Sequence, residues 1–189
     1  MEKVKTLEQE KKELNTLINK GIAFEIEDTE FEIKNKFFGL IKKRTPKKIK
    51  KSFKIEEPTL GTLDRLSSEW IELAIDEVQL KNEDGMQLAR TLVSNHAMRC
   101  AKIVALAVMG SDYLIPTCSR NGVVRYVENT NRLEELTGLF ARTVKPSKLY
   151  QLCVLINAMC NLGDFMNSIR LMSADRTSMP IRIEENNEV

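Results

Sequence analysis

Residues 52–66 read Ser52-Phe-Lys-Ile-Glu-Glu-Pro-Thr-Leu-Gly-Thr-Leu-Asp-Arg-Leu66, and the hydrophobic period changes within this stretch. Before Pro58, apolar and charged residues alternate, which is the period of a half-exposed β-strand. After Pro58 the apolar residues recur at helical spacing, and Thr62 is a suitable N-cap residue for the new helix. The stretch therefore predicts a junction between a β element and a helical domain.

Upstream of this junction, residues 23–27 and 30–34 alternate in the same way, and Asp28-Thr29 between them predicts a tight turn. Together with residues 52–56, these stretches predict three short strands in a small antiparallel β element. Such a small sheet needs cover from a helix to be stable. Its covered face would carry six apolar residues, namely Phe24, Ile26, Phe31, Ile33, Phe53 and Ile55.

Downstream of the junction the pattern is helical. A long helix is predicted from Asn82-Glu-Asp-Gly85 to about Met109, a second over residues 130–143, and a last one that begins at Ser147. Residues 123–127 are compatible with a strand or with a helix start. The fold class predicted is α+β, mainly α, with a small antiparallel β element at about 22–57 and a helical domain at about 62–172.

The chain divides accordingly into four segments. Residues 1–21 predict an amphipathic helix whose thin apolar stripe must dock on the chain's own core or on a partner. Residues 22–57 are the β element with a basic loop, and residues 58–172 are the helical domain. Residues 173–189 are polar and unpatterned, which predicts a flexible C-terminal tail.

Composition favours a globular protein of the reducing cytoplasm. Hydrophobic residues make up 42% of the 189 residues, enough for a core. The four cysteines form no CxxC pair and His96 is the only histidine, so free thiols are favoured over a zinc site. The most apolar run, residues 97–109, is short for a bilayer and predicts a core helix. We therefore expect no metal, no cofactor and no membrane association.

Catalytic motifs are not evident. His96 lies inside a predicted helix with no partner constellation, and this pattern is typical of a histidine on a helix surface or packed in the core. The sequence has no GxxxxGK[ST], GxGxxG or HExxH motif and no EF-hand loop. A non-enzymatic function is predicted. A helical enzyme whose carboxylates meet only in three dimensions stays open as an alternative.

The sharpest compositional feature is a basic segment at residues 34–54, which holds ten cationic residues and no acidic one. The whole chain carries +2, so the other residues together carry −8. Three interpretations stand: a solvated hairpin loop, a nucleic-acid-binding segment, or a site that docks on an acidic protein surface. The candidate partner-binding residues are Phe37, Phe38, Lys42, Lys43, Arg44, Lys47, Lys48, Lys50 and Lys51.

The sequence of residues 52–66, with EPTLGTLDRL at 57–66, resembles that of phage tail assembly chaperones. The order of predicted elements is also similar to that family from Phe24 to about Ile75. The resemblance implies a non-enzymatic protein that binds tape-measure and tail-tube proteins before tail assembly, in the cytoplasm of the infected bacterium. The N-terminal helix and the ten-charge insertion depart from the family pattern, and no functional residue is carried over. Two alternatives are a structural tail or connector component and a nucleic-acid-binding accessory protein that uses residues 34–54. Oligomerisation is left open.

Overall fold

The computed structural model describes residues 20–36, 41–79, 85–118 and 122–174, and it confirms the α+β, mainly α, fold class. The segments predicted as an N-terminal helix and a C-terminal tail lie almost entirely outside the described residues. Two antiparallel two-stranded sheets are present among the described residues. The elements in chain order are β1 (Ile22–Lys36), β2 (Ile41–Ile55), α2 (Leu60–Gln79), α3 (Gly85–Met109), the 3-10 helix η1 (Gly110–Tyr113), β3 (Leu114–Cys118), β4 (Val124–Glu128), α4 (Thr130–Thr143), α5 (Pro146–Met159) and α6 (Leu162–Ala174).

The β element is one long hairpin rather than three short strands. Strand β1 pairs with β2 without interruption from Ile22 opposite Ile55 to Lys36 opposite Ile41. The turn predicted at Asp28-Thr29 is therefore wrong, because both residues continue the strand. The predicted basic loop is also wrong, since its residues from 41 onward form the paired strand β2.

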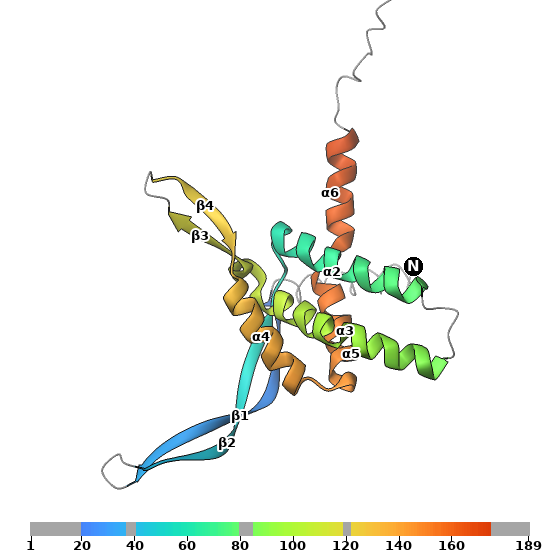
Figure 1. Ribbon diagram of the computed structural model, residues 1–189. Helices are drawn as coiled ribbons and strands as arrows, with labels where there is room; N and C mark the ends of the chain where they lie inside the picture. Colours follow the sequence, from blue (N-terminus) through green and yellow to red (C-terminus); the bar gives the residue numbers. More distant parts are fainter. Residues whose placement is uncertain (1–19, 37–40, 80–84, 119–121, 175–189) are drawn as a thin grey trace, which may run out of the picture.

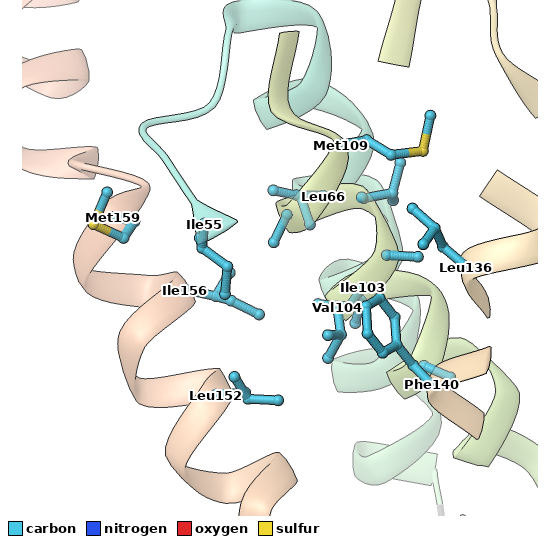
Figure 2. Close-up of a cluster of buried hydrophobic side chains, with 14 of the residues drawn as sticks. Ile55, Leu66, Ile103, Val104, Met109, Leu136, Phe140, Leu152, Ile156 and Met159 are labelled. Atoms are coloured by element: carbon cyan, nitrogen blue, oxygen red, sulfur yellow. The ribbon is translucent and has the colours of Figure 1, made fainter. Parts of the chain in front are cut away.

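Helix α3 is the centre of the helical body. It packs against α2, α4, α5 and strand β2, and residues 103–107 are buried consecutively. A run of buried residues longer than one turn requires neighbours on every side of a helix. Figure 2 shows the resulting cluster, in which Ile55 of the hairpin meets Ile156 of α5 and Val104 of α3 lies beside Phe140 of α4.

The base of the hairpin belongs to this core. Phe24 and Phe53 are paired across the two strands, and both rings contact Phe140. The ring centroids lie 5.9 Å apart for Phe24–Phe53, 6.0 Å for Phe24–Phe140 and 5.1 Å for Phe53–Phe140. Aromatic clusters of this kind add to the stabilisation from area burial alone. Beyond them the hairpin projects away from the helices (Figure 1).

The junction between the sheet and the helices differs from its predicted form in one detail. Helix α2 begins at Leu60, so Thr62 lies inside the first turn and is not the N-cap. The Thr62 side chain is fully buried, and its hydroxyl donates a hydrogen bond to the Gly110 carbonyl over 2.6 Å. Gly110, at φ +47°, ends α3 in a conformation that favours glycine. The threonine thus joins the start of α2 to the end of α3.

The predicted last helix is two helices. Helix α5 begins at Pro146, with Lys145 rather than Ser147 in the N-cap position. The chain then turns at Asn161, whose φ is 45°. The Asn161 amide donates to Glu57 over 3.2 Å and to Asp164 over 3.0 Å, which holds the turn. Helix α6 therefore leaves the body in a direction of its own (Figure 1).

Residues 124–128 form a strand, one of the two states the sequence allowed.

Two stretches, Gly85–Tyr113 and Pro146–Ser173, are long and apolar enough by composition to cross a membrane, with mean hydropathies of 1.2 and 1.3. The apolar C-terminal half of the first stretch is the buried centre of the helical body. Buried core helices can match membrane-spanning helices in length and apolar composition. The second is interrupted at Asn161, where α5 and α6 part. The expectation of no membrane association remains a prediction.

Candidate interaction surfaces

The predicted partner-binding residues fall along the hairpin. Phe37 and Phe38 lie outside the described residues. Lys42, Lys43 and Arg44 stand in β2 opposite residues 35, 34 and 33 of β1. The other four, Lys47, Lys48, Lys50 and Lys51, stand nearer the helical body, opposite residues 30, 29, 27 and 26.

The strand register divides the basic segment into two parts of different charge. The proximal hairpin, residues 22–32 paired with residues 45–55, contains five acidic residues on β1 and five lysines on β2, so its net charge is zero. The distal hairpin, residues 33–44, contains five cationic residues and no acidic residue, so its net charge is +5. Its cationic residues are Lys34, Lys36, Lys42, Lys43 and Arg44. The charge asymmetry seen in the sequence is therefore concentrated at the far end of the hairpin.

Asp28 connects the proximal hairpin to helix α4. Its side chain is only 3% exposed. It forms one ion pair with Lys51 Nζ at 2.9 Å and another with Arg142 of α4. The Thr29 backbone N–H also donates to Asp28 Oδ1 over 2.7 Å. The hydrogen bond from Lys51 holds the pKa of Asp28 below its usual range, with Thr29 and Arg142 acting in the same direction. Hydrogen bonds to Glu30 and Asp28 in turn raise the pKa of Lys51.

A second charged cluster, not predicted from the sequence, joins α2 to α3. The Glu69 carboxylate is buried, and it forms ion pairs with Lys102 Nζ at 2.6 Å, with Arg99 at 3.4 Å and with Arg65 at 3.6 Å. Arg99 also pairs with Glu72. Removing one partner of a buried pair leaves an uncompensated charge, so this cluster fixes how the two helices meet. No local motif marks the pairs between the two helices, because Arg99 and Lys102 lie about thirty residues from their carboxylate partners in the chain.

His96 is buried, at 5% exposure, so of the two predicted positions, helix surface or packed core, the structure has the packed one. It lines an apolar cavity of about 430 Å³ together with Leu73 of α2, Ala141 of α4 and Leu149 of α5. That volume lies within the range of small-molecule pockets. No local sequence pattern indicates the cavity, because its walls come from four separate helices.

The cysteines differ in exposure. Cys118 is exposed on β3, Cys160 is buried, and Cys100 and Cys153 are intermediate. Burial raises the pKa of Cys160 to about 11 and also raises the pKa of Cys100 and Cys153. Cys100, Cys153 and Cys160 are free thiols, as predicted. Thiols with a raised pKa carry little thiolate at neutral pH.

Exposed apolar side chains gather on two projecting elements. All residues of β4 are exposed, with Tyr126 at 69%. On α6, five apolar residues spaced three or four apart are 39–67% exposed, namely Leu162, Phe165, Met166, Ile169 and Met172. We call these five the α6 stripe. Exposed apolar patches of this kind mark interaction sites more often than isolated exposed residues do.

Within the part of the chain that the structure describes, no group of three or more His, Cys, Asp or Glu side chains is placed to hold a metal ion. No protein-family model, no curated protein and no solved structure matches this chain. The surfaces described above are therefore interpreted from their own chemistry.

Proposed function

We propose that this chain is a non-enzymatic assembly factor of a phage-like particle, of the tail assembly chaperone kind, and that it acts by binding protein partners. The observation that carries the proposal is the charge distribution of the hairpin. A projecting element that is neutral near the body and carries +5 at its far end presents its charge to another molecule. The resemblance of residues 57–66 to the sequences of the chaperone family also supports the proposal.

A protein partner with an acidic surface suits this hairpin. Charge complementarity steers the encounter and fixes the orientation of the complex, while apolar contacts supply most of the affinity. The distal sequence offers both, since residues 37–41 read Phe-Phe-Gly-Leu-Ile between cationic flanks. Under this proposal the clients are tape-measure or tail-tube proteins, and binding occurs in the cytoplasm before the tail assembles.

The test is co-expression of the full chain with tape-measure and tail-tube proteins, chosen from its own gene neighbourhood where such genes are found there, followed by affinity capture and titration. We expect the wild type to recover one of them. The double substitution Lys42→Glu/Lys43→Glu should weaken binding by about tenfold or more, because it reverses charge at the interface. The matched control, Lys47→Glu/Lys48→Glu, makes the same change of net charge in the proximal hairpin and should weaken binding by less than about threefold.

The same +5 also favours a second candidate function, nucleic-acid binding, and the same variants decide it. Binding through five phosphate contacts predicts that log K falls against log salt with a slope of about −4.5 for duplex DNA. If the wild type binds labelled DNA or RNA with this slope and captures neither client, the chaperone proposal is rejected. If it captures a client and binds no nucleic acid near 0.1 M salt, the second candidate is eliminated. Equal losses in the two double variants would show that the distal hairpin is not the client site.

A further inference from the structure

Helix α6 presents an apolar surface that no described element covers. The α6 stripe runs along one side of the helix at positions 162, 165, 166, 169 and 172, the i, i+3, i+4, i+7 spacing of a helix seam. Its residues remain 39–67% exposed, although the same spacing in a body helix is buried. Figure 1 shows α6 extending from the body on its own.

The direction of α6 is set by the body. Asn161, in the left-handed region at φ 45°, ends α5, and its amide donates both to Glu57, which lies beyond the end of β2, and to Asp164 of α6. A helix held in this way presents its apolar side in a defined orientation, which lowers the entropy cost of binding.

Four of the five residues of the α6 stripe are placed symmetrically about position 167, and Met166 is the exception because its mirror position is Ser168. Leu162 and Met172 lie five residues to either side of this point, and Phe165 and Ile169 lie two residues to either side. Two copies of α6 in antiparallel contact would therefore place Leu162 opposite the second copy's Met172, and Phe165 opposite the second copy's Ile169. This is the self-complementary arrangement that a two-fold interface requires. In heptad notation, Leu162 and Ile169 occupy a positions, and each faces a d position of the second copy, as in an antiparallel coiled coil.

We propose that α6 binds α6 of a second copy of this chain as an antiparallel helix pair. The pairing opposes no like charges, because Asp164 and Arg170 lie outside the stripe on the helical wheel. The 13-residue helix is about 20 Å long, so the two bodies lie at opposite ends of the pair. Complete burial of the five side chains from their present exposures would remove at most about 500 Å² per copy from water. The total of about 1,000 Å² is at the lower limit for specific interfaces.

This interface is independent of the hairpin, so its failure would leave the proposed function untouched. The test is sedimentation of the full chain over a concentration series up to about 100 µM, since an interface of this size holds a weak complex. We expect a monomer–dimer equilibrium that Ile169→Glu shifts to monomer by at least about tenfold in Kd, because it buries an unpaired charge. The matched control is Leu171→Glu on the same helix, since Leu171 is 67% exposed and lies off the stripe. It should leave the dimer intact.

Orientation is tested by oxidation of a Met166→Cys variant in a Cys118→Ser background, which removes the exposed native thiol. In the antiparallel pair the two copies of position 166 lie about 3 Å apart along the axis on the same side of the seam, so a disulfide dimer should form. Leu171→Cys in the same background should remain monomeric. A wild type that is monomeric throughout the series, a dimer that survives Ile169→Glu, or α6-dependent binding only to a different protein or to lipid vesicles would each overturn the proposal.

Discussion

The proximal and distal parts of hairpin β1–β2 share one unbroken strand pairing and differ in what surrounds them. The proximal part inserts Phe24 into the helical body, and Asp28 bonds to Arg142 of α4. The distal part extends beyond the helices and carries +5. The same secondary structure thus serves as core at one end and as a charged projection at the other. Mutations of the proximal residues that contact the helices should change folding, and mutations in the distal part should change binding.

The largest effect is expected from Phe24→Ala, compared with Phe31→Ala in the same strand. Phe24 is 6% exposed in the aromatic cluster, whereas Phe31 is 63% exposed. Removing a buried phenyl group should lower the free energy of unfolding by about 3–5 kcal/mol. The same change at an exposed position should stay within about 0.5 kcal/mol. Urea unfolding followed by far-UV circular dichroism measures both, and equal losses would contradict the insertion of the base of the hairpin into the helical body.

An intermediate effect is expected from Asp28→Asn. It removes a buried charge that Lys51 and Arg142 stabilise, and because both cations are partly exposed the loss should be about 1–2 kcal/mol at neutral pH. The pKa of Asp28 is lowered in the folded protein, so its contribution is present above the unfolded pKa of about 3.9 and is lost as the pH falls through the folded value.

The measurement is the unfolding free energy of wild type and variant across the acidic range. The difference between them should be constant above about pH 5 and shrink below about pH 4. The control is Glu27→Gln, the exposed neighbour on the same strand. A difference that persists unchanged into strong acid would show that the Asp28 charge does not connect the hairpin to α4.

The smallest effect is expected from removing single lysines of β2. The change in stability should have opposite signs in the distal and proximal parts of the hairpin. Lys43 stands opposite Lys34, whereas Lys47 stands opposite Glu30. Like charges directly opposite destabilise a strand pair and unlike charges stabilise it. Lys43→Ala should therefore raise stability by about 0.3 kcal/mol and Lys47→Ala should lower it by about the same amount. Thermal unfolding at low and high salt checks this, since screening should reduce both changes. Changes of the same sign would contradict the register-based charge division.

Much of the fold could be predicted because its signals are local. The change of period around Pro58 located the β-to-helix junction, and the boundaries of α4 match the predicted helix at residues 130–143. The candidate site was predicted less well. Its cationic residues were identified, but they were assigned to a loop. The sequence did not show that five of these ten residues lie on a strand paired with the five acidic residues of β1. Charge counts along a chain say nothing of strand register.

Distant contacts explain what the sequence did not show. Asp28-Thr29 has the composition of a turn, yet it continues a strand because it pairs with Lys48 and Ile49 of β2. Arg142, 114 residues away, binds the Asp28 carboxylate in that position. The turn at Asn161 involves Glu57, 104 residues away. Helices α3 and α6 both carry apolar faces, and only packing decides that one is buried and the other exposed.

The sequence by itself determined the fold class, the place of the junction and the cationic composition of the hairpin, because periodicity, proline and glycine act within a few residues. The tertiary structure decided where that charge is concentrated, which carboxylates are buried and which apolar helix is left uncovered. Those features depend on partners that meet only when the chain is folded.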